Sequence, residues 1–547
     1  MDFEKIVHVE KAGTLSRFIS SKEKQTIRSL KITGEINAKD VDDVLDEMCS
    51  SDGHYEGDAP DDEWIIHEKS SPRLRFLDLS ECNFVDGNKF PDGCWYTLLQ
   101  YIAFPQGIEN TTSSEYSSAF ELAPKLETVI LPEGLKEVGL FNGCENLRNI
   151  TIPESVTIIG DHTFSYCRKL TKLYIPKNVD YIGAGAFAQS GIESFDLAKD
   201  NPYYTVVDGV IFSKDLKKIV AFPPAPRQHY DIPIGTEVIG AGAFDDCNLD
   251  TITIPDTVRK IETDAFQCSG LHELYIPDSV TEIGSCSFRG SSEMEKIRLP
   301  QGITNLEYCL SSCKKLKELD IPASVKQMDM SNIAFCESLE HIYLHDGFEE
   351  FTGDKGPRLS ERGYLKEIYF PKTFRSFPGG LFHHCPDLKE YKIDSENPYM
   401  TTVDGVLYSK DLKKLIAVPD VHRKEFIIPE GVEEIGKYTF MGFRYIETIS
   451  LPSTLKRIGH RAFNWCYALK EMHLPVTLSE IDYRAFDDCK SLQKLYVESK
   501  NPPVFIDVNP HWRFASDSKN LTVYVPNERV ENYKKAEGWR DLDIQSM

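Results

Sequence analysis

The sequence lacks both a long hydrophobic run and an excess of basic residues. No window approaches the roughly eighteen consecutive apolar residues that a membrane-spanning helix needs, although 41% of the 547 residues are hydrophobic. Lys and Arg number 62 against 86 Asp and Glu, which gives a formal net charge of −24. An acidic surface of this kind repels phosphate backbones and anionic lipid. We therefore expect no nucleic-acid partner and no membrane span.

Signatures of catalysis and of export are also missing. We find no Walker loop, no G-x-S-x-G, no H-E-x-x-H and no EF-hand loop, so we predict a non-enzyme with no catalytic residues and no cofactor. The first thirty residues carry Asp2, Glu4 and Lys5 and have no apolar stretch typical of a signal peptide. This start fits either a cytosolic protein or a mature form whose signal has been removed.

Proline, by contrast, recurs at a regular spacing. Successive prolines lie 21 to 23 residues apart from Pro132 to Pro176, from Pro233 to Pro322 and from Pro429 to Pro475. The repeat has the form L-x-x-[IL]-x-[IL]-P-x-x-[VL]-x-x-[IV]-x-x-x-[AT]-F-x-x-C, as in residues 147–167 and 469–489. A period of this length is typical of a solenoid.

Each repeat predicts one strand. Leu173 and Ile175 alternate with Lys172 and Tyr174, which is the pattern of a half-buried strand, and Pro176 ends it because proline has no N–H for a neighbouring strand. The irregular spacing that follows predicts a short turn of helix or 3-10 helix. One repeat cannot bury its apolar side chains by itself, but stacked repeats can. The predicted fold is therefore an α/β leucine-rich-repeat solenoid with one parallel strand per coil.

The repeats divide the chain into four parts. We predict an N-terminal capping module at 1–48 with a strand and a helix, an acidic loop or linker at 49–69, the solenoid at 70–519, and a C-terminal cap with a strand and an amphipathic helix at 520–547. Strands are expected near 27–32, 74–79, 126–131, 147–152, 170–175, 192–197, 249–254, 271–276, 294–299, 316–321, 339–344, 365–370, 388–393, 446–451, 469–474 and 492–497, and weaker ones near 99–104, 228–232, 424–428 and 521–525.

One segment of the solenoid is duplicated. Residues 201–218 return almost unchanged at 397–414, an offset of 196. Asp208-Gly209 and Asp404-Gly405 lie between β-branched runs and predict type I′ turns. We therefore expect a small β-meander at 201–222 and another at 397–418, each projecting from one edge of the solenoid. Covering that edge and binding a partner are both open roles for them.

Six of the fourteen cysteines occupy the last position of the repeat, namely Cys144, Cys167, Cys247, Cys385, Cys466 and Cys489. We predict that they are unpaired and buried, because free cysteine packs as a small apolar residue, with a disulfide ladder or a metal site as the alternative. His383-His384-Cys385 is the only dense His/Cys cluster, and we predict no metal site there. Asp245-Asp246 and Asp487-Asp488 are expected to be solvated turn residues.

The outward-facing strand positions form the candidate binding site. They should line one sheet, which we expect to be the concave face, with Asp320, Lys392 and His473 on intervening coils. Tyr and Arg are enriched in binding hot spots, although the strand propensity of Tyr is an alternative explanation. The candidate ligand-binding residues are Tyr174, Tyr275, Arg298, His341, Tyr343, Glu367, Tyr369 and Tyr496.

The sequence resembles BspA-like leucine-rich-repeat proteins over roughly residues 70–547. The resemblance is carried by the repeat units, by the D-G-V-[IL]-[FY]-S-K-D inserts and by the terminal VYVPNERVENYKKAEGW. The AGTL…ITGEIN start resembles the amino-terminal module of exported members. The resemblance implies a bacterial surface protein that adheres to host matrix proteins or contacts other cells. The chain departs from the family in lacking a lipobox cysteine and in its irregular coils at 302–314 and 346–364.

Together these observations predict a non-catalytic binding scaffold that acts in adhesion or protein interaction at the bacterial cell surface or outside the cell. Its partner is expected to be a host matrix or cell-surface protein or a glycan, and the protein is expected to be a monomer. A signal peptide or lipid anchor would then have been removed from this numbering. The alternative is a glycan-capture component of a surface degradative system.

Overall fold

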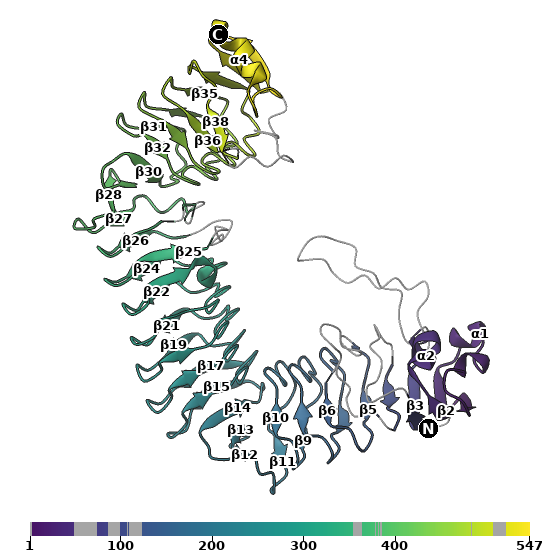
Figure 1. Ribbon diagram of the computed structural model, residues 1–547. Helices are drawn as coiled ribbons and strands as arrows, with labels where there is room; N and C mark the ends of the chain where they lie inside the picture. Colours follow the sequence, from purple (N-terminus) through teal and green to yellow (C-terminus); the bar gives the residue numbers. More distant parts are fainter. Residues whose placement is uncertain are drawn as a thin grey trace. The chain divides into compact units, whose positions relative to one another are not determined.

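The structure is a computed structural model that forms two compact units. It describes residues 3–46, 48, 74–85, 99–106, 108, 123–139, 141–353, 364–377, 379–380, 382, 385–482, 484–506 and 521–547. Unit 1 consists of Met1–Leu271 with Glu282–Phe288, and unit 2 of His272–Thr281 with Arg289–Met547. In each unit, short strands stack one coil upon the next in chain order (Figure 1).

Unit 1 contains every strand that the repeat predicts for it. We call these the main strands. They are β2 (Ser29–Ile36), β3 (Phe76–Phe84), β4 (Tyr101–Ala103), β5 (Thr128–Ile130), β7 (Asn149–Thr151), β9 (Tyr174–Ile175), β11 (Asp196–Leu197), β15 (Arg227–Asp231) and β17 (Leu249–Thr253). An additional strand, β1 (Lys5–Val9), pairs in parallel with β2 at the start of the stack.

Unit 2 confirms the remaining predicted strands. Its main strands are β19 (Glu273–Tyr275), β21 (Lys296–Arg298), β22 (Glu318–Ile321), β24 (His341–Leu344), β26 (Glu367–Phe370), β27 (Lys392–Ile393), β31 (Glu425–Ile427), β33 (Thr448–Ser450), β35 (Glu471–Leu474), β37 (Lys494–Val497) and β39 (Thr522–Val525). One strand that was not predicted, β40 (Asp543–Ser546), pairs in parallel with β39. The leucine-rich-repeat solenoid is confirmed.

Most coils carry a second strand where the sequence predicts a helical turn, so that part of the prediction is wrong. In unit 1 these second strands are β6 (Glu137–Val138), β8 (Ile158–Ile159), β10 (Tyr181–Ile182), β16 (Val238–Ile239), β18 (Lys260–Ile261) and β20 (Glu282–Ile283). In unit 2 they are β23 (Gln327–Asp329), β25 (Glu350–Thr352), β32 (Glu434–Ile435), β34 (Arg457–Ile458), β36 (Glu480–Asp482) and β38 (Val504–Ile506). The backbone bonds to the adjacent coil instead of to itself, as Gly183 N does to Ile159 O at 2.9 Å.

The irregular coil predicted at 302–314 is confirmed, because the described residues from Gly302 to Cys313 form turns and no second strand. In the next coil, a 3-10 helix at Met330–Ile333 directly follows the second strand β23. The other irregular segment, 346–364, contains β25 but lies partly outside the described residues, as does the whole of the predicted linker at 49–69.

The C-terminal helix and the helical segment at 38–46 correspond to the predicted helices, whereas α1 (Ser21–Lys24) was not predicted. Near the N-terminus, α1 is followed by α2 (Ala38–Asp40) and a π-helical segment at Val41–Asp46. Near the C-terminus, α4 (Val530–Lys535) buries Tyr533, and Trp539 just after it donates its indole N–H to Pro503 O at 2.9 Å. The domain boundaries at 48 and 520 stay predictions.

The buried side of the turns is built from ladders of Phe and Cys. The rings of Phe440, Phe463 and Phe486 stack with centroid separations of 5.5 and 5.1 Å. Cys489 Sγ donates to Phe463 O at 3.0 Å, and burial raises the pKa of this thiol to about 12. All six repeat cysteines are buried, and none of the twelve cysteines that the structure describes forms a disulfide. The prediction of unpaired, buried repeat cysteines is therefore confirmed.

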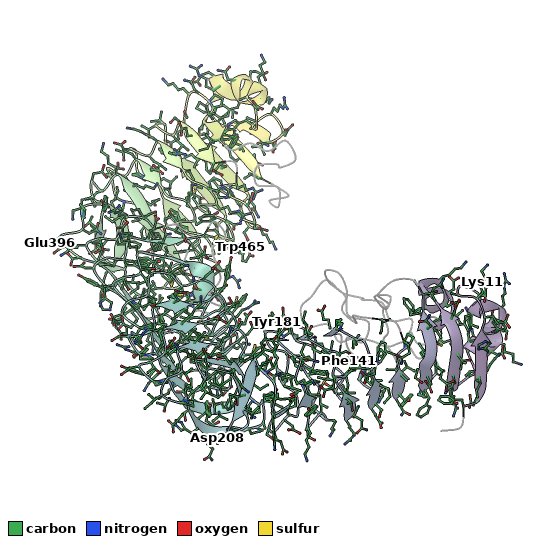
Figure 2. The ribbon with its side chains drawn as sticks, turned by 60° about the horizontal axis from the view of Figure 1, so that its bottom comes forward. Lys11, Phe141, Tyr181, Asp208, Glu396 and Trp465 are labelled. Atoms are coloured by element: carbon green, nitrogen blue, oxygen red, sulfur yellow. The ribbon has the colours of Figure 1, made fainter. Side chains whose placement is uncertain are left out.

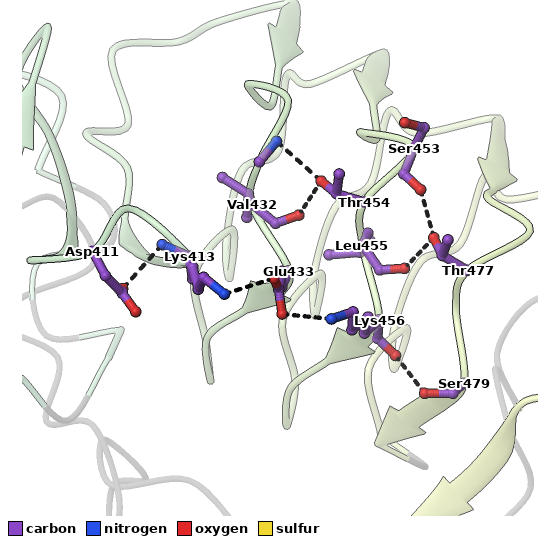
Figure 3. Close-up of polar contacts among 11 residues, drawn as sticks. Asp411, Lys413, Val432, Glu433, Ser453, Thr454, Leu455, Lys456, Thr477 and Ser479 are labelled. Carbon is purple, nitrogen blue, oxygen red and sulfur yellow. Dashed lines mark hydrogen bonds and ion pairs between the residues drawn. The ribbon is translucent and has the colours of Figure 1, made fainter.

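Hydroxyl side chains hold the coils at a fixed spacing on another side. Thr454 Oγ1 donates to Val432 O at 2.8 Å, and Thr477 Oγ1 donates to Leu455 O at 2.7 Å (Figure 3). Ser155 makes the same contact with Leu135 O in unit 1. Each of these residues lies two positions after a repeat proline. The recurrence of Ser and Thr at this position could therefore have predicted these bonds between coils, but the repeat consensus did not include it.

The duplicated segments form the predicted meanders, β12 (Tyr204–Val207), β13 (Val210–Ser213) and β14 (Lys218–Ala221) in unit 1, and β28 (Met400–Val403), β29 (Val406–Ser409) and β30 (Lys414–Ala417) in unit 2. Asp208 and Gly209 have φ of 50° and 80°, as a type I′ turn requires, and Asp208 lies at the outer end of its hairpin (Figure 2). β14 pairs with β16, so the meander continues the sheet of second strands with β12 at its edge, and Ile211 and Phe212 are buried. The projection of the meander from the solenoid stays a prediction.

A buried asparagine fixes each meander to the preceding coil. The fully buried Asn201 donates from Nδ2 to Pro176 O and Val179 O, both at 3.1 Å. Its Oδ1 accepts the backbone N–H groups of Tyr203 and Tyr204 at 2.8 Å. Asn397 repeats the pattern in unit 2, also with four backbone bonds. The first residue of the duplicated segment is thus its anchor.

Asp245 is not the solvated turn residue that the sequence predicts. Its side chain is 3% exposed, its Oδ2 lies 3.9 Å from His162 Nδ1, and its Oδ1 has no hydrogen-bond partner in the structure. Burial, together with the smaller effect of the neighbouring carboxylates of Asp246 and Asp264, raises the pKa of the Asp245 carboxyl to about 8. Asp487, in the identical A-F-D-D-C sequence of unit 2, is only half-buried.

Replacing Asn201 with Ala should lower the free energy of unfolding of unit 1 by about 2–4 kcal/mol, because two carbonyls and two N–H groups lose a buried partner. The midpoint of urea unfolding measures this loss. Asn178→Ala is the control, since the exposed Asn178 makes a single bond to Glu154 O, and it should cost less than about 1 kcal/mol. Equal losses in the two variants would contradict the anchoring role.

Replacing Asp245 with Asn should stabilise the protein increasingly as the pH rises. The pKa of the Asp245 carboxyl is about 8 in the folded state and near 4 in the unfolded state. Below pH 4 the carboxyl therefore does not lower the free energy of unfolding, and between pH 4 and about pH 8 it lowers this free energy progressively. The gain in unfolding free energy should be small at pH 4 and of the order of several kcal/mol above pH 8. Urea unfolding across this range measures it, with Asp487→Asn as the matched control. A gain independent of pH would refute the assignment.

Candidate binding surface

Outward-facing side chains of the main strands in unit 2 lie on two successive sheets, one that contains β19 and β21 and one that contains β22, β24 and β26. Tyr275, Tyr343 and Tyr369 are 60%, 46% and 47% exposed. Strand register aligns Asp320 of β22 with Tyr343 of β24 and Tyr369 of β26. We call the exposed side of β19, β21, β22, β24 and β26 the tyrosine face. Tyr343 and Tyr369 are thus partners on paired strands, while their role as ligand-binding residues stays a prediction.

At one end of the tyrosine face, Arg298 is held in a fixed position. Its Cζ lies 4.8 Å from the centroid of the Tyr275 ring. Nη1 donates to Ile276 O and Nη2 to Asp278 Oδ2, both at 2.8 Å. The bond from Arg298 keeps the pKa of the Asp278 carboxyl below its usual value. Tyr275 thus presents an aromatic ring and Arg298 a planar cation, and both are ordered before any ligand binds.

Charged groups surround the two central tyrosines. Tyr369 OH donates to Asp394 Oδ2 at 3.1 Å, and the His341 ring stacks against Tyr343 with centroids 6.2 Å apart. Nδ1 of the same histidine lies 3.9 Å from Glu367 Oε2. Lys392 bonds to Glu367 at 2.9 Å and thereby lowers the pKa of that carboxyl. These contacts orient the side chains and leave Tyr343 and Tyr369 about half-exposed.

Tyr496 belongs to a second aromatic group on β35, β37 and β39. Its ring stacks on His473 at 4.4 Å and on Tyr524 at 5.0 Å between centroids, with planes within 13° and 18° of parallel. Sequence reasoning missed Tyr524 because its coil departs from the repeat. The signal was nevertheless present, since Tyr524-Val525-Pro526 matches Tyr174-Ile175-Pro176 in another coil.

The eight candidate residues do not all lie together. Tyr174 is 41% exposed on β9 and belongs to unit 1, whereas the other seven belong to unit 2. Within unit 2, His341, Tyr343, Glu367 and Tyr369 share two paired strands. The structure therefore supports a compact patch centred on β24 and β26, with Tyr275 and Arg298 on strands of the same stack.

The described part of the chain has neither a membrane-spanning helix nor a cluster of metal-ligand side chains. No helix there is long and apolar enough to cross a membrane. No group of three or more His, Cys, Asp or Glu side chains in these residues has the arrangement of a metal site. The His383-His384 pair considered from the sequence lies outside the described residues.

Solved structures with a similar fold are bacterial leucine-rich-repeat proteins. A leucine rich cell surface protein from Faecalibacterium prausnitzii is 20% identical over 64% of this chain and 96% of its own, with a TM-score of 0.44. A leucine-rich repeat protein from Bacteroides ovatus is 21% identical over 72% and 88%, with a TM-score of 0.40. The pneumococcal vaccine antigen PcpA is 16% identical over 85% and 95%, with a TM-score of 0.27.

No curated protein matches the chain. A family model does, and its match follows the repeats described above. The model is that of the BspA type leucine rich repeat region, with six copies, and it matches residues 89–215, 237–355, 307–404 and 420–505, which is more than half of the chain. The chain therefore belongs to the BspA type leucine-rich-repeat family.

Proposed function

We propose that this protein is a non-catalytic scaffold that binds another protein through the tyrosine face. The observation that carries the proposal is the exposed, aligned pair of Tyr343 and Tyr369 on a rigid parallel sheet. Tyr369 is oriented by its bond to Asp394 and Tyr343 by its stack with His341. Half-exposed tyrosines that are already oriented lose little conformational freedom on binding, which helps to make Tyr and Arg frequent hot spots. Their regular spacing along the stack suits an extended partner.

The geometry of the aromatic rings favours a protein over a glycan on the main strands. On the tyrosine face, the Arg298 guanidinium lies over the Tyr275 ring and the His341 ring stacks against Tyr343, so each of these rings has one face occupied. A sugar that packs flat against an aromatic ring needs an uncovered face, whereas the ring edges and hydroxyls exposed here can contact peptide groups and aliphatic side chains. Glycan capture therefore stays the second candidate for this surface.

The proposed location is the bacterial cell surface, and the proposed role is adhesion. This part rests on membership of the BspA type family and on the resemblance that its repeats imply. Protease treatment of intact cells that express the complete gene tests it. Cleavage of the protein without cell lysis would support surface exposure, and full protection would contradict it.

Replacing Tyr343 and Tyr369 together with Ala should leave the melting temperature unchanged, because both side chains point to solvent, and should weaken binding by about 2 kcal/mol or more. Matrix proteins and polysaccharides would first be screened against the wild type, and any bound molecule then titrated against the double variant by calorimetry. The matched control is Tyr399→Ala with Tyr445→Ala, two tyrosines of unit 2 that are 46% and 55% exposed away from the main strands.

Two outcomes would count against the proposal. Equal affinity of the wild type and the Tyr343/Tyr369 variant would move the binding site off the tyrosine face. A polysaccharide that binds where no protein does, with an affinity that depends on these tyrosines, would favour the glycan-capture alternative.

A further inference from the structure

A pocket of about 540 Å³ lies in unit 2 beside the second strands, on a different sheet from the tyrosine face. Residues of β30, β32, β34 and β36 line it, and Gly353, Ser376 and Phe377 from the coils before the meander close one end. Its size is within the range that small-ligand sites occupy.

Two glycines at the corners of successive coils form the floor of the pocket. A Cβ on Gly459 would lie 2.9 Å from the backbone of Gly436 and of Ile435, closer than such contacts occur, so no side chain fits there. Both glycines follow the last residue of a second strand, the position that Asp482 takes one coil later. These glycines let the backbones of adjacent coils approach closely, and together with Asp482 they line one side of the pocket, which we call the trough.

The far end of the trough holds a histidine in one orientation. The side chain of Asp482 is 4% exposed, and its Oδ1 lies 2.9 Å from His460 Nδ1. The same carboxylate oxygen accepts the backbone N–H of Arg484 at 3.1 Å. With Nδ1 engaged, the other ring nitrogen of His460 is directed away from Asp482 and has no hydrogen-bond partner among the described residues. It is available to a ligand hydroxyl or carboxylate.

The charges that line the pocket are opposite in sign to those of the chain as a whole. Lys414, Lys437 and Arg457 face Glu434 and Asp482, so the lining carries one net positive charge with His460 neutral, whereas the whole chain carries −24. Lys414 is paired with Glu434 at 2.8 Å. Among the described residues Arg457 has one ion pair, from Nε to Glu480 Oε2 at 3.6 Å, so its two terminal nitrogens can hold a carboxylate.

We infer that this pocket binds a small hydroxylated carboxylate, the chemistry of an acidic sugar. Arg457 and Lys437 would hold the carboxylate, and His460 and Glu434 would accept or donate hydrogen bonds to the hydroxyls. Tyr438, whose ring packs edge-on against His460 at 5.4 Å, and Phe377 supply apolar walls. This inference does not depend on the proposed protein binding, since it uses none of the residues of the tyrosine face.

The experiment compares glucuronate with glucose, which differ only in a carboxylate for a CH₂OH group, on the full chain by ligand-observed NMR and calorimetry. Glucuronate should bind saturably and at least about tenfold more tightly than glucose. Arg457→Gln should weaken glucuronate binding at least about tenfold while leaving the melting temperature unchanged, since its surface ion pair contributes little stability. Lys456→Gln is the control, because the adjacent Lys456 bonds to Glu433 outside the pocket (Figure 3).

A second arm separates free acidic sugars from the ends of polysaccharide chains. A disaccharide with terminal glucuronate should bind as tightly as glucuronate or more tightly if the pocket receives chain ends, and about tenfold more weakly if it encloses the free sugar. Equal affinity for glucuronate and glucose, no saturable binding up to about 50 mM, or an unchanged affinity in Arg457→Gln would each overturn the inference.

Discussion

The backbone hydrogen bond from each coil to the next is the constraint on which the rest of this structure depends. Gly183 N bonds to Ile159 O, and Phe164 N bonds to Ala186 O, so adjacent coils are fixed in register on more than one side. A fixed register places equivalent residues of successive repeats above one another. The Phe and Cys ladders inside and the Thr and Lys–Glu contacts outside all follow from that alignment.

The same register gives the exposed surfaces their character. Tyr343 and Tyr369 are neighbours because β24 and β26 pair without a shift, and the glycine trough exists because Gly436 and Gly459 occupy the same corner of adjacent coils. One solenoid therefore offers two chemically different surfaces, an aromatic and acidic row on the main strands and a polar pocket beside the second strands. The first suits an extended partner, and the second a small one.

The two meanders show how the solenoid accepts an insertion. The third strand of each takes the place of a second strand, β14 beside β16 and β30 beside β32, so the ladder of that sheet continues. Asn201 and Asn397 satisfy the backbone groups at the point of entry. An insertion of this kind lengthens the chain between two coils that remain neighbours on the turn side, where Gln189 bonds to Asp246 at 2.9 Å across 57 residues.

Sequence alone determined the period, the main strands, the Asp-Gly hairpins and the buried cysteines, because each depends on alternation, proline or glycine within one repeat. It also named Tyr343, Tyr369 and Arg298, whose outward direction follows from strand alternation. Only the tertiary structure decided the second strands, the asparagine anchors and the pocket of His460 and Asp482. Identical A-F-D-D-C sequences bury Asp245 and leave Asp487 half-exposed, because burial is set by the coils packed on either side, and those lie far away in the chain.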